Sequence, residues 1–225
     1  MPHSALIRTF TGRTLDLLAP EPEAIAIEDI AHGLAHTCRF SGQCARFYSV
    51  AEHAVRVSQM VPAEHALIGL LHDASEAYLS DLVSPLKVLR DLSGYRAIEA
   101  ALMDVILRRF CPGWPAQAGP RDPGAPPGLP ESVERADHEL VELEMAVLFD
   151  GLDIVNLDYH APVVAERLFL FRFKYLSLRM RATPAPANQG ETFGAIVYLE
   201  RIQRELTQLR NALGLPPAGD HGCGA

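Results

Sequence analysis

The sequence predicts an all-α fold, a single helical bundle with a small extended or hairpin element at its N-terminus. Apolar residues recur at helical spacing along most of the chain, and the pattern shows no strands alternating with these helices as in a parallel sheet. The chain has 225 residues, of which 48% are hydrophobic, and a chain of this length buries a sizeable core in one domain. We expect that domain to span residues 1–213 and residues 214–225 to form a disordered tail.

The elements are predicted in order from local signals. The turn residues Thr11-Gly12-Arg13 lie within residues 1–24 and predict the short hairpin. Ser49 and Glu52 form a capping-box pattern, which predicts that a helix begins directly after Ser49. Residues 112–130 hold seven prolines and four glycines, a composition that predicts a surface loop. The spacing of apolar residues predicts helices at 25–36, 50–60, 63–79, 93–110, 131–149, 161–181 and 190–213.

Charge and cysteine content argue against several classes of protein. The chain carries 20 basic and 28 acidic residues, a net charge of −8, which is unlike a protein that coats nucleic acid or binds an anionic membrane. The four cysteines include no Cys-x-x-Cys pair, which indicates reduced thiols rather than a disulfide framework. The N-terminus lacks a signal-peptide pattern, and the apolar runs fall far short of the roughly 20 residues that span a bilayer. We expect a cytoplasmic protein whose partner is a small molecule, with neither a nucleic-acid polymer nor a membrane as partner.

The most informative motif is His72-Asp73-Ala-Ser-Glu76, which directly follows an apolar run. Burying an unpaired Asp costs several kcal/mol, so Asp73 needs a partner or a metal ion. Glu76 follows His72 by four residues, which places the three polar side chains on one side of a helix. Imidazole and carboxylate groups are ligands for Zn, Mn, Fe and Co. Taken alone, however, the motif fits a capped or salt-bridged helix better than a metal site.

Two further residues change this interpretation. His53 interrupts the apolar positions of the helix expected at 50–60, and Asp137 interrupts the apolar face of the helix expected at 131–149. Three helices would then each bring a polar ligand to an apolar interior. The sequence therefore predicts one metal site formed by His53, His72, Asp73 and Asp137.

The order His53…His72-Asp73…Asp137 resembles the signature of the HD superfamily of metal-dependent phosphohydrolases. The stretch from His72 to Lys87, His-Asp-Ala-Ser-Glu-Ala-Tyr-Leu-Ser-Asp-Leu-Val-Ser-Pro-Leu-Lys, most resembles the bacterial 5'-deoxynucleotidases and phage-type enzymes that cleave deoxynucleoside triphosphates. Upstream, Arg-Phe at positions 39–40 resembles the pair that contacts the nucleotide in that group. The resemblance covers roughly residues 5–150. It departs from the group's pattern in having Ser at position 80 for the usual Gly, and Gln at position 43 where relatives often carry His.

The resemblance implies an HD-domain fold and a phosphohydrolase acting on deoxynucleotides, either a 5'-deoxynucleotidase or a triphosphohydrolase. It implies one divalent metal ion (Mn, Co, Zn, Fe or Mg) held by the four ligands already named. Glu76 would orient or deprotonate the attacking water, and Asp81 would be a second acid or base. Arg39 and Lys87 would neutralise phosphate oxygens beside Phe40.

Other functions remain open from the sequence. A hydrolase of (p)ppGpp commonly shows Glu-Asp after the His-Asp pair, whereas this chain has Glu76-Ala77. A cyclic-dinucleotide esterase needs Gly-Tyr-Pro, but Gly94-Tyr95 is followed by Arg96. A non-catalytic nucleotide-binding protein with this fold is a third alternative. The base, the number of phosphates, the native metal and a homo-oligomeric state are left open.

Several polar residues have a plain structural interpretation. Glu144 lies two helical turns after Asp137 on the same inward face, which indicates an interior salt bridge or a group that orients Arg39. Four other histidines show no ligand spacing to the metal cluster and are expected at the surface or as satisfied core residues: His32, His36, His65 and His160.

Overall fold

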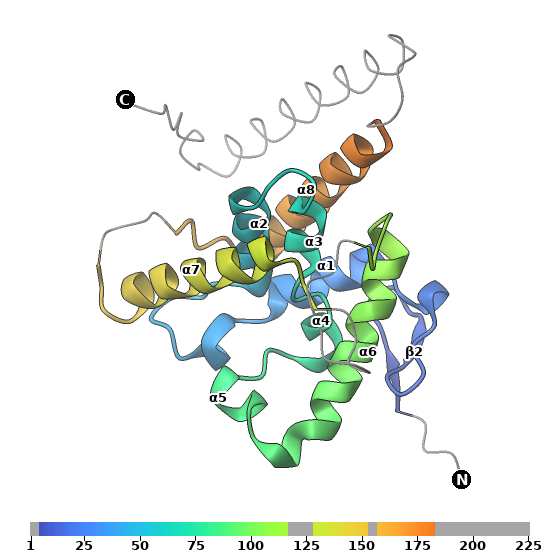
Figure 1. The fold of residues 1–225 in the computed structure, drawn as a ribbon. Helices are drawn as coiled ribbons and strands as arrows, with labels where there is room; N and C mark the ends of the chain where they lie inside the picture. The colour runs from blue at the N-terminus through green and yellow to red at the C-terminus, as the bar shows by residue number, and fades with distance from the viewer. Residues whose placement is uncertain (1–4, 117–127, 153–156, 183–225) are drawn as a thin grey trace. The chain divides into compact units, whose positions relative to one another are not determined.

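The computed structural model describes residues 5–116, 128–152 and 157–182. The chain divides into two compact units, residues 1–177 and 178–225, and the first contains every site residue discussed below. Helices dominate it, with one small hairpin at the N-terminus (Figure 1), so the predicted fold class is confirmed. The helix expected at 190–213, the tail, and residues 117–127 of the predicted loop lie outside the described residues.

The hairpin pairs strand β1 (Leu6–Arg8) with strand β2 (Thr14–Asp16) in antiparallel register. Its turn contains Gly12 at a φ of 85°, a backbone conformation that glycine adopts without strain. The turn is tied to the first long helix, because Thr11 Oγ1 donates a hydrogen bond of 3.0 Å to Asp29 Oδ2.

The helices have the following bounds: α1 (Ile27–His36), α2 (Val50–Met60), α3 (Ala66–Leu71), α4 (Glu76–Leu79), α5 (Ser84–Lys87), α6 (Ser93–Phe110), α7 (Glu131–Leu148) and α8 (Pro162–Ala182). Short 3₁₀ turns lie at η1 (Pro22–Ala24), η2 (Arg39–Gly42) and η3 (Arg90–Leu92). Among the described residues, no helix combines the length and apolar character needed to cross a bilayer.

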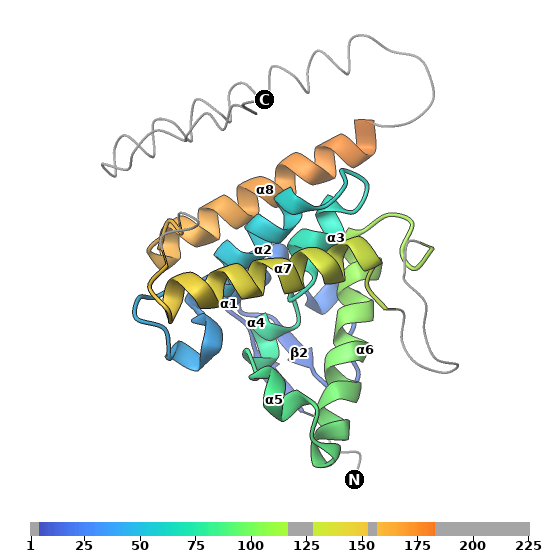
Figure 2. The ribbon, with the colours of Figure 1, turned by 60° about the vertical axis from the view of Figure 1, so that its left-hand side comes forward.

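Helix α2 is the centre of the packing, since it contacts α1, α3 and α7 (Figure 2). It begins with the predicted capping box: Ser49 Oγ accepts a hydrogen bond from the Glu52 backbone N–H, and the Glu52 carboxylate accepts one from the Ser49 backbone N–H. The cap satisfies two backbone donors at a buried helix end. It therefore fixes where His53, one residue further on, enters the interior.

The single helix expected at 63–79 is wrong in one respect. Helix α3 ends at Leu71, and tight turns separate it from α4, with the Glu76 N–H donating to Asp73 O at 2.9 Å. His72 Nδ1 lies 2.8 Å from Gly69 O, the carbonyl that the N–H of residue 73 would use in a continuous α-helix. This side-chain contact accounts for the break, which carries His72 and Asp73 into the interior.

Helices α1 and α4 approach each other closely at Gly33. A Cβ atom at this position would lie 2.6 Å from the backbone O of Ala77 and 2.8 Å from its Cα, which is closer than atoms pack. Only glycine allows this separation, so Gly33 sets the position of α4 and of Glu76 at its start.

Candidate metal centre

The structure brings the four predicted ligands together from three parts of the chain. His53 comes from α2, His72 and Asp73 follow α3, and Asp137 comes from α7. His53 Nε2 lies 3.3 Å from His72 Nε2 and 2.9 Å from Asp137 Oδ1. His72 Nε2 lies 3.1 Å from Asp73 Oδ2 and 3.7 Å from Asp137 Oδ1, and His53 Nε2 lies 3.9 Å from Asp73 Oδ2.

Three of these five separations are close to those of ligands on one ion, and the other two are longer. Ligand atoms about 2.1 Å from a metal lie about 3.0 Å apart at right angles and about 3.4 Å apart in a tetrahedron. The five distances run from 2.9 to 3.9 Å. The donor set, two imidazoles and two carboxylates, also suits a divalent ion. These buried and half-buried groups could therefore hold a metal.

Hydrogen bonds behind the two imidazoles orient them for this role. His53 Nδ1 lies 2.8 Å from Glu144 Oε1, and His72 Nδ1 lies 2.8 Å from Gly69 O. A carboxylate or carbonyl oxygen only accepts, so each Nδ1 carries a proton and donates it. Each Nε2 then faces the carboxylates of the centre, where a metal ion could replace the proton that Nε2 shares with them, as in carboxylate–histidine–metal arrangements.

The charge around the centre favours a cation. Burial raises the pKa of Asp137, but hydrogen bonds to His53 and His72 outweigh it and hold the pKa well below its usual value. Burial lowers the pKa of His72, yet Asp73 and Asp137 raise it well above its usual value. The carboxylates therefore stabilise positive charge at this position, which a proton or a metal ion can supply.

Arg39 is a buried partner of these acids. Its Nε lies 3.0 Å from Glu144 Oε2, and one terminal nitrogen lies 3.6 Å from Asp73 Oδ2. It belongs to η2, where Phe40 has a φ of 55°. Phe40 packs edge-on against Phe149, with its ring centroid 5.3 Å away. Arg39 thus contacts the predicted ligand Asp73 and the His53 partner Glu144, whereas Phe40 contacts Phe149 directly after α7.

Glu76 and Lys87 form a second pair beside the centre. Lys87 Nζ lies 3.0 Å from Glu76 Oε1 and 2.9 Å from Glu99 Oε1. Burial, together with Asp73 and Asp81, raises the pKa of Glu76 to about 9, although Lys87 opposes this. Burial also raises the pKa of Asp81, with Asp73 acting in the same direction and Arg39 opposing it. Glu76 therefore binds a proton tightly next to the predicted ligands.

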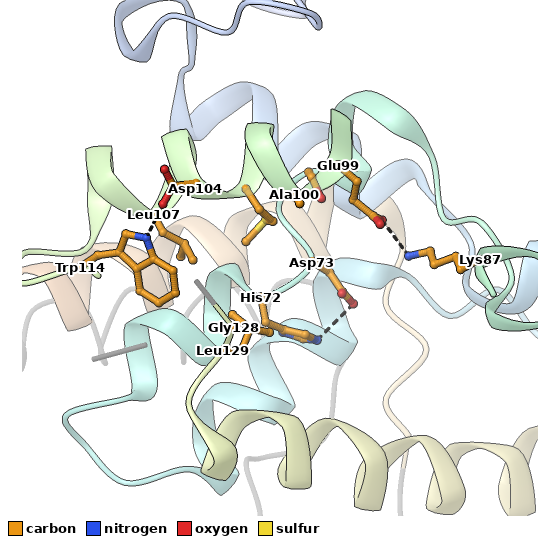
Figure 3. Close-up of a pocket in the computed structure, with 12 residues that line it drawn as sticks. His72, Asp73, Lys87, Glu99, Ala100, Asp104, Leu107, Trp114, Gly128 and Leu129 are labelled. Carbon is orange, nitrogen blue, oxygen red and sulfur yellow. Dashed lines mark hydrogen bonds and ion pairs between the residues drawn. The ribbon is translucent and has the colours of Figure 1, made fainter. Parts of the chain in front are cut away.

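A pocket of about 300 Å³ opens on this side of the centre. Figure 3 shows His72, Asp73 and the Lys87–Glu99 pair at one end of it, and Trp114 with Asp104 at the other. Trp114 Nε1 donates to Asp104 Oδ1 at 2.9 Å. The pocket therefore joins a charged end to an apolar end. Arg39 and Phe40 lie outside the set of described residues that line it.

Three features of the site were missed by the sequence analysis. Glu144 was expected to pair with Arg39 or another interior group, but its contact with His53 was not predicted. Glu99 on α6 and Trp114 carried no motif and no spacing signal, because both reach the site through long-range packing. The sequence around Glu99, on a helix of mixed polarity, offered nothing that would distinguish it from a solvated residue.

Comparison with known proteins places the chain in a family. It is 38% identical to the protein YfdR of Escherichia coli K12 over 188 residues, which cover 77% of this chain and 96% of YfdR. The chain belongs to the YfdR family. A further relative of this YfdR-family chain is RCAP_rcc00048 of Rhodobacter capsulatus, 38% identical over 138 residues, 57% of this chain and 63% of that protein. Both relatives are described as uncharacterized proteins, and no family model matches the chain. The chemistry of this YfdR-family member is therefore argued from its own site.

Proposed function

We propose that the protein is a metal-dependent phosphohydrolase of the HD superfamily that acts on deoxynucleotides. The observation that carries the proposal is that Nε2 of His53 and Nε2 of His72 lie 3.3 Å apart and that each lies 2.9 to 3.9 Å from a carboxylate oxygen of both Asp73 and Asp137. The tautomers of both imidazoles, fixed by Glu144 and Gly69 O, add support. The two Nε2 atoms already face the centre, so these residues would hold a divalent metal ion in place of the protons shared with the carboxylates.

The ion would supply positive charge and a water molecule of lowered pKa next to the phosphorus. The protein's own residues orient the ligands and balance the charge of the carboxylates. Glu144 and Gly69 O hold His53 and His72 through Nδ1 and keep the two rings in the orientation required. Arg39 balances Glu144 and Asp73, which allows several carboxylates to gather in the interior.

Glu76 is the group that we assign to proton transfer. It is 4% exposed, and within the described part of the chain its Oε2 is buried without a hydrogen-bond partner. Lys87 holds the other oxygen, Oε1. Burial and the neighbouring acids that raise its pKa make Glu76 a stronger proton acceptor than an ordinary carboxylate. One oxygen is thus anchored while the other is free to exchange a proton with water or a leaving group.

Lys87 is the cation placed to contact a phosphate. It lines the pocket, and its side chain is 26% exposed. Both cations contact two carboxylates, but the Arg39 side chain is only 9% exposed and does not line the pocket. Fixed positive charge at the developing phosphoryl charge stabilises the transition state. The apolar end at Trp114 offers a surface for a nucleoside.

The test is a hydrolysis panel on the full-length protein. The protein is stripped with a chelator, reloaded with Mn²⁺, Co²⁺, Zn²⁺, Fe²⁺ or Mg²⁺, and given dAMP, dATP, AMP, ATP and ppGpp. We expect metal-dependent release from a deoxynucleotide, with the product identified as phosphate, pyrophosphate or triphosphate. Asp137→Asn, which removes a ligand, should abolish it. Metal-loaded protein that binds nucleotides without hydrolysing any of them would overturn the proposal in favour of a binding role.

A further inference from the structure

A second group of potential metal ligands lies between α1 and α8. His32 and His36 are four residues apart on α1, so they share one face of that helix. Glu166 comes from α8. One ring nitrogen of each histidine and one carboxylate oxygen of Glu166 all lie within 4.8 Å of one another. These residues are different from those of the candidate metal centre.

The contacts within this group are short and directional. His32 Nδ1 lies 3.0 Å from Glu166 Oε2, with the two side chains 31% and 21% exposed. Ligands on adjacent positions of one ion lie about 3.0 Å apart. The pair therefore already has the spacing of two ligands, with a proton now shared between nitrogen and oxygen.

The third residue, His36, has a fixed tautomer. Its Nδ1 lies 2.8 Å from His32 O, and a carbonyl oxygen only accepts, so Nδ1 carries the proton. Its Nε2 is the ring nitrogen left to bind an ion. Hydrogen bonding of one ring nitrogen to a backbone carbonyl is the arrangement by which ligating histidines are oriented.

Aromatic packing holds the His32 ring in place. The ring of Phe10, in the hairpin, stacks on it with centroids 3.7 Å apart and planes 5° apart. The His36 ring lies 4.0 Å from it on a tilt of 33°. A stacked imidazole keeps its edge, where both nitrogens lie, available for binding. The site is thus partly organised before an ion binds.

We propose that His32, His36 and Glu166 bind one first-row transition metal ion of the zinc class. Two imidazoles and a carboxylate are a common ligand set for such ions, with a position left for water. The ion would take the place of the proton between His32 and Glu166. Because these two residues lie 134 positions apart in the chain, the bound ion would tie α8 to α1. This proposal does not rest on the proposed hydrolase function.

The test is zinc titration calorimetry on chelator-treated full-length protein. The wild type should bind two equivalents of zinc. The His36→Ala variant should bind only one equivalent, or should bind the second at least tenfold more weakly than the wild type does. His138→Ala is the matched control, because His138 is an exposed histidine next to Glu142, 3.4 Å away, with no place in the cluster; it should bind as the wild type does. Mg²⁺ should not compete, because imidazole suits zinc and not magnesium.

A second measurement separates this site from the candidate metal centre. Asp137→Asn should lose the equivalent at the centre and keep the one at α1 and α8, and zinc should still raise its Tm. Glu166→Gln and His36→Ala should lose that rise while their metal-free Tm and helical circular dichroism stay as in the wild type. Full zinc binding in both of these variants, or equal loss in His138→Ala, would overturn the proposal. Failure of the hydrolysis panel would leave this result unaffected.

Discussion

Glu144 Oε1 lies 2.8 Å from Nδ1 of His53, and both side chains are completely buried. A carboxylate in such a position is costly unless it is paired, and here Arg39 and His53 together hold it ionised. Burial raises the pKa of Glu144, but His53 and Arg39 lower it by more than burial raises it. The pKa of Glu144 therefore lies below its usual value. The charge on Glu144 thereby determines which nitrogen of His53 faces the candidate metal centre.

Glu144→Gln should therefore weaken metal binding at the centre. The amide keeps the shape but can also present its NH₂ group to His53, so the ring loses its fixed tautomer. Partners of this kind contribute about 10- to 100-fold in metal affinity. Competition with a chromophoric chelator measures the change. Glu142→Gln, two residues away on the exposed face of α7, is the control, and equal affinity in both variants would exclude a role for Glu144.

Glu76→Gln should separate metal binding from turnover. The substitution preserves the hydrogen bond to Lys87 and removes the group that exchanges a proton. We expect metal content close to wild type and a fall in kcat on the order of 10²-fold or more. Metal analysis and steady-state kinetics on the preferred substrate measure both. Loss of the metal with full activity on reloading would assign Glu76 to the metal instead.

The stability of the metal-free protein should fall with rising pH because of Glu76. Its pKa rises from 4.5 to about 9 on folding, so the folded state binds the proton more tightly than the unfolded state. This contribution is fully present below pH 4.5 and is lost as the pH approaches about 9. Urea unfolding of wild type and Glu76→Gln between about pH 5 and pH 9 tests it. The free energy of unfolding should decline more steeply in the wild type, and parallel curves would contradict the prediction.

Lys87→Ala should affect substrate binding and leave the metal in place. Lys87 lines the pocket, and its removal takes away a point charge that we assign to a phosphate oxygen. We expect KM to rise about tenfold or more and kcat/KM to fall, with unchanged metal content. Arg90→Ala removes an exposed cation three residues further on and should leave both constants as in the wild type. Equal effects of the two variants would reduce Lys87 to a general electrostatic role.

Arg39→Ala tests whether η2 reads the sugar. The resemblance to deoxynucleotidases predicts that this variant discriminates less between dAMP and AMP. In the structure Arg39 pairs with Glu144 and Asp73, so the variant should also weaken the metal site. Comparing the dAMP/AMP ratio of kcat/KM at saturating metal isolates the first effect, and an unchanged ratio would make Arg39 a positioning residue for the ligands alone.

Most helices could be predicted because their signals are local. The capping box at Ser49 and the apolar spacing after it gave the bounds of α2, and α7 ended within one residue of the expectation. The break between α3 and α4 could not be predicted, because it depends on where the His72 side chain finds its acceptor. Helical periodicity continues through residues 72–75, so the pattern contains no sign of the turn.

In the candidate site, too, residues with a local sequence signal could be predicted and residues placed by helix packing could not. His53, His72, Asp73 and Asp137 stood out because each places a polar group on an apolar face, and the structure brings them together. Glu166 carried no such signal, because its partner His32 lies on another helix 134 residues away. Pairings of this kind follow from how the helices pack, which a single sequence does not specify.

The close contact of Gly33 with Ala77 means that the distance between two backbone segments sets the position of Glu76. A single methyl group there would act as a wedge between α1 and Ala77, the residue directly after Glu76. It would push the Glu76 carboxylate, to which we assign proton transfer, away from its neighbours while leaving every charged residue of the chain unchanged. A substitution at position 33 therefore changes where Glu76 lies. A protein engineer could use it to move the Glu76 side chain without altering Glu76 itself.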